Sequence, residues 1–68
     1  MAMAIINGRR VQIPDTVSDE EIRRVGRIKP GRTLIKRDRF GNYVLPRGSK
    51  VNVNDGDTFV DAPARIKG

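Results

Sequence analysis

One segment, residues 18–27, combines a helix start signal with helical hydrophobic spacing and so constrains the fold more than any other. Ser18 is followed three residues later by Glu21, the pattern of a capping box, in which two side chains satisfy backbone N–H groups at the helix start. Acidic residues come first and arginines later, an order that complements the helix macrodipole. Gly26 and then Pro30 close the segment. These signals predict one short helix with Ser18 as its N-cap, and a helix this short needs a sheet to pack on.

The sequence before this segment predicts a β-hairpin. Residues 3–13 contain two short apolar runs around Asn7-Gly8, the pair that best tolerates the positive φ angles of a two-residue type I′ turn. In the second run Val11 and Ile13 alternate with polar residues, which is typical of a strand with one solvated face.

The sequence after the helix predicts further strands. A polar turn at residues 38–42 separates a run at 33–36 from a run at 43–45, which indicates a second hairpin. A short extended piece at 51–53 and a turn at 54–57 lead to a last strand at 58–61. The order is strand, strand, helix, strand, strand, short extended piece, strand, and it predicts an α+β fold with a mixed sheet of four to five strands packed on one helix.

The expected core combines one face of each strand with the apolar stripe of the helix. Its members are Met3, Ile5, Val11, Ile13, Val17, Ile22, Val25, Ile28, Leu34, Val44 or Tyr43, Leu45, Val51, Val53 and Phe59. The other face of the sheet is left to solvent or to a partner.

Length and composition limit both the fold and the chemistry. The 68 residues, 37% of them hydrophobic, support one small domain, expected at residues 1–63 with a flexible tail at 64–68. The sequence contains neither Cys nor His, which removes thiolate ligands, the commonest metal ligand and the usual general base. The aspartates lie in or beside predicted turns, where Asp satisfies backbone donors. We therefore expect no enzyme, no metal and no cofactor. The longest apolar run, residues 1–6, is far shorter than a membrane span, so we also expect no membrane partner and a cytoplasmic protein.

The ordering of these elements resembles the ubiquitin-like β-grasp over nearly the whole chain. The start at residues 6–11, Ile-Asn-Gly-Arg-Arg-Val, and the end at 54–63, Asn-Asp-Gly-Asp-Thr-Phe-Val-Asp-Ala-Pro, are similar to bacterial multiubiquitin-type domains. The same turns are similar to the sulfur carriers of thiamin and molybdopterin synthesis. The multiubiquitin resemblance implies protein–protein recognition, with activating- and conjugating-enzyme homologues as partners. Conjugated modifiers and sulfur carriers end in Gly-Gly, whereas here Lys67 precedes Gly68, which is the candidate residue for conjugation.

Adjacent residues Leu34 and Ile35 must point to opposite faces of their strand, so only one of them joins the core. The resemblance to the Leu-Ile strand of ubiquitin implies that Leu34 is buried and that Ile35 is the centre of an exposed recognition patch. The basic residues expected to flank Ile35 in this partner-binding surface are Arg32, Lys36, Arg37 and Arg39.

The formal charge of +6 leaves an alternative function open, that of a small basic nucleic-acid-binding protein. Arginines outnumber lysines, ten to four, and arginine suits bidentate contact with carboxylates as well as with phosphates. Among the aromatic residues only Phe40 and Tyr43 are left for base stacking if Phe59 is in the core. An acidic protein partner accounts for the same charge, and so does a solvated basic surface without a ligand.

Overall fold

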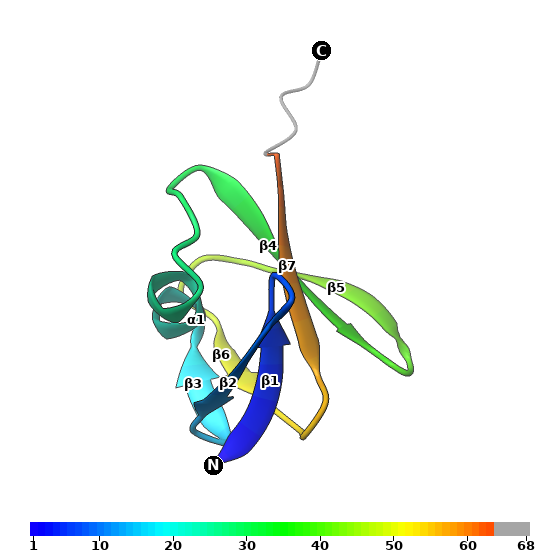
Figure 1. The fold of residues 1–68 in the computed structure, drawn as a ribbon. Coiled ribbons are helices and arrows are strands. Elements are labelled where there is room, and N and C mark those ends of the chain that lie inside the picture. The colour runs from blue at the N-terminus through cyan, green and yellow to red at the C-terminus, as the bar shows by residue number, and fades with distance from the viewer. Residues whose placement is uncertain (64–68) are drawn as a thin grey trace.

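The computed structural model describes residues 1–63. Within them lie one short helix and seven strands, and the strands form two sheets (Figure 1). The elements are β1 (Ala2–Ile6), β2 (Arg9–Ile13), β3 (Thr16–Ser18), α1 (Asp19–Val25), β4 (Arg32–Asp38), β5 (Gly41–Leu45), β6 (Lys50–Asn52) and β7 (Thr58–Pro63). The main sheet has the order β2-β1-β7-β4-β5, and β3 pairs with β6 in a small second sheet. The predicted tail at 64–68 lies outside the described residues.

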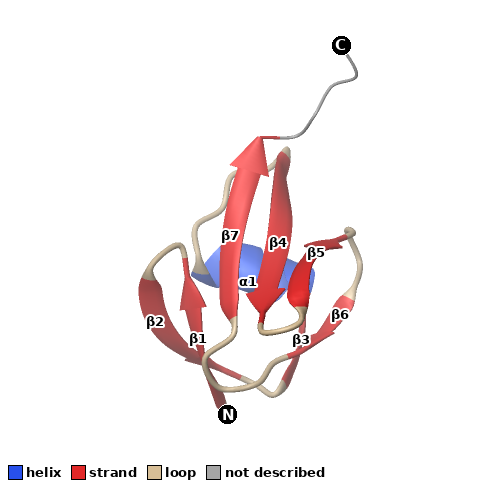
Figure 2. Ribbon diagram, turned by 90° about the vertical axis from the view of Figure 1, so that its right-hand side faces the viewer, coloured by secondary structure: helices blue, strands red, loops and turns tan. Residues whose placement is uncertain are grey.

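The main sheet is mixed, because β1 and β7 run parallel while its other neighbouring strands run antiparallel. The last strand thus lies in the middle of the sheet, between β1 and β4. In Figure 2 helix α1 lies behind this sheet, so one face is covered and the other is open to the viewer. The predicted α+β class with a mixed sheet and one helix is confirmed for the described residues, and the arrangement is compatible with a β-grasp.

The helix begins as predicted. Ser18 has extended backbone angles, and its Oγ accepts a hydrogen bond from the N–H of Glu21 at 3.2 Å. Asp19 is fully buried at the first helical position, where its carboxylate accepts from the N–H of Gly48 at 2.9 Å and from Nε of Arg23 at 3.4 Å. These contacts fasten the first turn of α1 to the connection between β5 and β6.

The helix ends at Gly26 as predicted, but the left-handed residue of its cap is the one that follows. The N–H of Ile28 donates to the C=O of Arg23 at 2.8 Å and that of Arg27 to Arg24 at 3.2 Å, the pair of bonds in a Schellman motif. Arg27, not Gly26, takes the left-handed conformation, with φ 55 against −85.

The first hairpin has the predicted turn, with φ 48 at Asn7 and φ 85 at Gly8. The prediction of which β1 side chains are buried, however, is wrong by one residue, because Met3 and Ile5 were expected in the core. Ala2, Ala4 and Ile6 are buried, whereas Met3 and Ile5 are half-exposed on the opposite face. The two alanines lie opposite Ile13 and Val11 of β2, so the larger side chains of β2 fill the space that the alanines leave.

The rest of the core follows the prediction closely. Its buried members are Ala2, Ala4, Ile6, Ile13, Val17, Ile22, Ile28, Leu34, Val51, Val53 and Phe59, with Val11, Val25 and Leu45 packed against them. Neither Tyr43 nor Val44 joins the core, since both are exposed on β5. Strand β3 was not predicted, because its pairing with β6 joins residues more than thirty positions apart. No helix within residues 1–63 is long and apolar enough to cross a membrane.

Candidate protein-binding surface

The face of the main sheet that points away from α1 is the candidate site, and we call it the outer face. Side chains alternate between the two faces of a strand, so the strand registers assign each residue to a face. The outer face consists of Met3, Ile5, Arg10, Gln12, Thr33, Ile35, Arg37, Asn42, Val44, Thr58, Val60 and Ala62.

An apolar row crosses three strands of the outer face. Ile35 on β4 lies directly between Val60 on β7 and Val44 on β5. Ile35 and Val60 are half-buried against their neighbours, and Val44, at the edge of the sheet, is 65% exposed. Directly opposed β-branched pairs stabilise a sheet, but the exposed side of this row also offers apolar area to a partner. We call these three residues the apolar row.

A second row of the outer face lies two residues further along the strands and contains two arginines. In register order it runs from Arg10 through Ile5 and Thr58 to Arg37. The two guanidinium groups therefore lie on strands on either side of Ile5 and Thr58. An apolar row beside two arginines is suited to a protein surface that combines aliphatic side chains with carboxylates.

The structure brings only part of the predicted site together. Ile35 lies on the outer face as expected and Leu34 is fully buried behind it. Arg37 also lies on the outer face. Arg32 and Lys36 are each two residues from Leu34 along β4, so their side chains lie on the same face as Leu34 and not on the outer face. The expectation that these two flank Ile35 on one surface is wrong, because an odd spacing along a strand changes the face.

Arg32 is engaged in an ion pair between two strands. Its Nε donates to Oδ2 of Asp61 on β7 at 2.7 Å, and its carbonyl oxygen accepts from Nη1 of Arg23 at 2.9 Å. The Arg32 guanidinium lowers the pKa of the Asp61 carboxyl below its ordinary value, and a hydrogen bond from Asn7 acts in the same direction. Arg32 thus joins β4, β7 and the helix rather than facing a partner.

Lys36 is used in a similar way at the other end of β4. Its Nζ donates to the carbonyl oxygen of Asn52 at 3.0 Å and lies 3.5 Å from Oδ2 of Asp57 and 3.8 Å from Oδ2 of Asp38. Asp57 is itself buried and accepts from the N–H of Asn54 at 2.8 Å. Lys36 therefore neutralises a buried carboxylate in the turn before β7.

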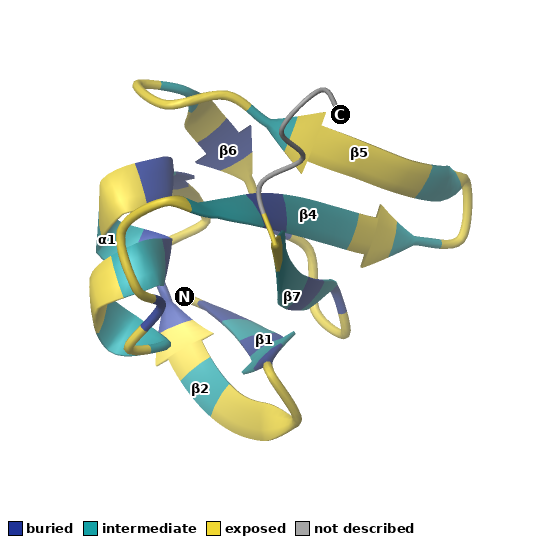
Figure 3. Cartoon of the chain, turned by 90° about the horizontal axis from the view of Figure 1, so that it is seen from above, coloured by how far each residue is buried: buried dark blue, intermediate teal, exposed yellow. Residues whose placement is uncertain are grey.

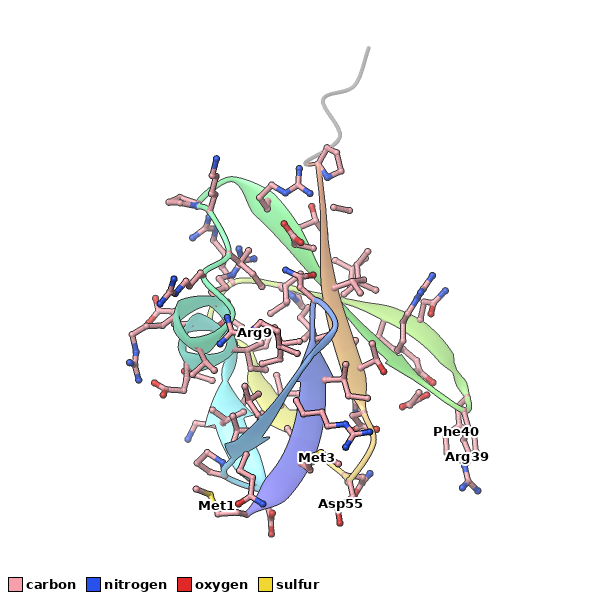
Figure 4. All side chains as sticks on the ribbon, viewed as in Figure 1. Met1, Met3, Arg9, Arg39, Phe40 and Asp55 are labelled. Carbon is pink, nitrogen blue, oxygen red and sulfur yellow. The ribbon has the colours of Figure 1, made fainter. Side chains whose placement is uncertain are left out.

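Arg39 lies apart from Ile35, at the tip of the β4–β5 hairpin. Figure 4 shows Arg39 and Phe40 together at this tip, away from the body of the molecule. Phe40 is 79% exposed, the most exposed large apolar side chain of the described residues. The tip is a separate feature from the apolar row.

Arg10, Val44 and Val60 belong to the outer face but were not among the predicted site residues. Arg10 could have been found from the sequence, because it alternates with Val11, which faces the core. Val44 and Val60 could not, because only the register shows that both lie opposite Ile35. The predicted conjugation residue, Gly68, lies outside the described residues.

Comparison of the chain with protein-family models, curated proteins and solved structures found no match. Residues 1–63 contain no group of three or more His, Cys, Asp or Glu side chains that could hold a metal ion. The outer face is accordingly the feature on which a functional proposal rests.

Proposed function

We propose that this chain is a ubiquitin-like protein that acts by protein–protein recognition through the outer face of its main sheet. The observation that carries this proposal is the apolar row, in which Val60, Ile35 and Val44 lie side by side on the face that α1 leaves uncovered. Arg10 and Arg37 beside it favour a partner surface that contains carboxylates. The fold supports the ubiquitin-like part of the proposal through its element order and its parallel central pair of strands.

The test is site-specific photocrosslinking in cells that express the full chain. A photoreactive phenylalanine analogue replaces Val44 on the outer face or, as the control, Glu20 on the exposed side of α1. We expect covalent adducts to a defined protein from position 44 and not from position 20. Adducts that are equal at both positions, or absent at position 44, would contradict the proposal.

The purified partner then allows affinities to be measured for matched variants. Ile35→Thr keeps a β-branched residue in the strand, and we expect it to weaken binding by at least about tenfold, which corresponds to 1.4 kcal/mol. Phe40→Ser removes a more exposed apolar side chain from the hairpin tip, and we expect it to leave the affinity unchanged. Equal effects of the two substitutions would show that recognition is not centred on the apolar row.

Covalent attachment is a separate hypothesis within this proposal. It requires the carboxylate of Gly68 to be activated by ATP, as the resemblance implies. Mass spectrometry after incubation with ATP, magnesium and an activating-enzyme homologue should detect an adenylate or a thioester. An unchanged mass would remove the modifier function but not recognition by the outer face. If a sulfide donor is added to the same mixture, sulfide can displace AMP from the adenylate, and a mass gain of one oxygen-to-sulfur exchange would support the sulfur-carrier alternative.

Binding of single-stranded nucleic acid is a second candidate, and the hairpin tip is the observation that favours it. Phe40 is exposed there beside Arg39, and Tyr43 is exposed further along β5, a combination that suits base stacking next to phosphate contact. This function predicts retention on single-stranded DNA or RNA at about 50 mM salt and a loss of affinity in Phe40→Ser. Absence of retention at that salt concentration would dismiss it.

A further inference from the structure

Strand β5 forms an edge of the main sheet and lacks the devices that usually protect an edge. It pairs with β4 on one side and with no other strand of the described residues. Its sequence, Gly-Asn-Tyr-Val-Leu, contains no charge and no proline, although 32% of the chain is charged. Edge strands are normally blunted by charges, prolines or bulges, since they otherwise pair with other chains. The opposite edge, β2, carries Arg9 and Arg10.

The register shows which backbone groups of β5 are open. Asp38 and Gly41 close a two-residue turn as a hydrogen-bonded pair, and hydrogen-bonded pairs alternate along antiparallel strands. The N–H and C=O groups of Asn42 and Val44 therefore point away from β4. Within residues 1–63 these groups make no other backbone hydrogen bond. Figure 3 shows that β5 is exposed along most of its length.

The side chains of β5 indicate what an added strand would contain. Val44 ends the apolar row at this edge, so an aliphatic residue of an added strand would continue the row beside it. It would also cover Val44, which is 65% exposed. The arrangement selects an extended peptide with aliphatic residues at alternate positions.

The charges around β5 indicate the sign of the partner. Arg39 precedes the strand and Arg47 follows it, and no carboxylate of residues 1–63 lies within 4.0 Å of either side chain. Arg47 also lines a hollow of about 320 Å³ at the end of the strand, together with Leu45 and Arg32. A second copy of the chain, paired antiparallel through β5, would bring Arg39 of one copy close to Arg47 of the other. Like charges in that position disfavour self-pairing and favour an acidic partner.

We propose that β5 binds an extended acidic peptide as an additional strand of the main sheet. This inference rests on the proposed function, protein recognition, and names the class of partner. Backbone hydrogen bonds to Asn42 and Val44 supply affinity, an aliphatic residue beside Val44 supplies register, and carboxylates near Arg39 and Arg47 supply charge selection.

The experiment is an NMR titration of the full chain with a capped peptide of about ten residues, in which valines alternate with threonines and glutamates lie at both ends. We expect the amide hydrogens of Asn42 and Val44 to exchange at least about tenfold more slowly in the complex. Methylation of alternate peptide nitrogens should abolish binding, because it removes the donors to β5. A peptide with lysines in place of the glutamates should bind at least about tenfold more weakly.

Two variants with the same added charge localise the site. Val44→Lys places a charge on the open edge and should weaken peptide binding by at least about tenfold. Gln12→Lys places it on the opposite edge and should leave the affinity unchanged. Both positions are exposed, so neither variant loses core packing.

Four outcomes would overturn the proposal. If the methylated peptide binds as well as the unmethylated one and no β5 amide is protected, side-chain docking replaces strand addition and the proposed function stands. If the lysine peptide binds equally well, the charge selection is wrong. If no amide signal shifts at about 1 mM peptide, β5 is not a strand acceptor, and the Ile35→Thr comparison decides the proposed function independently. If sedimentation shows a dimer that Val44→Lys disrupts, the occupant of the edge is a second copy.

Discussion

Gly26 shows how a residue can be placed correctly by sequence reasoning but for a different physical cause. A glycine at a helix end suggests that the backbone needs a positive φ, yet Gly26 has φ −85 and Arg27 takes the left-handed angle. A β-carbon at Gly26 would lie 2.4 Å from Cγ2 of Ile6, a contact that no real β-carbon makes. Gly26 is required because the helix end and β1 lie too close for a side chain.

We therefore expect Gly26→Ala to destabilise the protein. Alanine is favoured over glycine in helices by up to about 1 kcal/mol, but overpacking a core usually costs about 1–3 kcal/mol, so the net effect is a loss. Urea unfolding measures the difference. In the double variant with Ile6→Ala the clash is absent, so the combined cost should be smaller than the sum of the two single costs. Strict additivity would refute the contact as the cause.

Substitution of Arg27 should have the opposite effect. A non-glycine residue in the left-handed conformation costs roughly 1–2 kcal/mol, and Arg27 is exposed without a carboxylate within 4.0 Å among residues 1–63. Since glycine also loses more backbone entropy on folding, we expect Arg27→Gly to raise the free energy of unfolding by about 0.5–1 kcal/mol. Arg27→Ala removes the same charge but keeps the β-carbon, and it should bring no gain. A gain of equal size from alanine would assign the effect to charge.

At the level of elements, β4 and β7 are held together by a charged pair as well as by their ladder. Arg32 lowers the pKa of Asp61 below 3.8, and a carboxyl with a lowered pKa in the folded state contributes stability that is complete above its unfolded pKa. That contribution is lost as the pH falls through the folded pKa.

The difference in unfolding free energy between wild type and Asp61→Asn should therefore be constant from pH 7 to about 5 and shrink below pH 3.8. Urea unfolding at a series of pH values checks this. In an Arg32→Gln background the same comparison should show a weaker pH dependence, because the main cause of the shift is absent. A difference that grows on acidification would have the wrong sign for this pair.

Elements with local signals were predicted and those that depend on distant partners were not. The turn between β1 and β2 is specified by Asn7-Gly8, which adopt the positive φ angles that the turn needs. The start of α1 is specified by Ser18, whose side chain bonds to the backbone three residues later. Strand β3 has no such signal, because Thr16–Ser18 becomes a strand only by pairing with β6. The facing of β1 was missed because alternation alone does not say whether small or large residues face the core.

The candidate site was predictable to the same extent. The alternation of Leu34 and Ile35 places one inside and one outside whatever the neighbours are. The surface around Ile35 is set instead by register across three strands, which brings in Val60 and Val44. Arg32 and Lys36 were assigned to that surface as neighbours in sequence, but parity directs them to the carboxylates of Asp61 and Asp57 on the other face.

At the level of the whole molecule, the charge is divided between structural and available cations. In residues 1–63 the cationic side chains that lie within 4.0 Å of side-chain carboxylates are Arg23, Arg24, Arg32 and Lys36, all on α1 or β4. The arginines on the outer face and around β5 make no such pairs. Binding through these surfaces should therefore weaken as ionic strength rises, whereas the less exposed pairs of Arg23, Arg32 and Lys36 are screened less.

The parallel pairing of β1 with β7 also determines how the molecule would respond to mechanical load. The two strands run in the same direction, so the start of β1 and the end of β7 lie at opposite ends of the sheet (Figure 1). A force that pulls these two ends apart acts along the strands, in shear. The hydrogen bonds of Ile5 to Asp57 and of Asn7 to Phe59, both 2.9 Å long, would then be strained together instead of opening one after another. This geometry makes the junction of β1 and β7 the part of the fold that resists stretching.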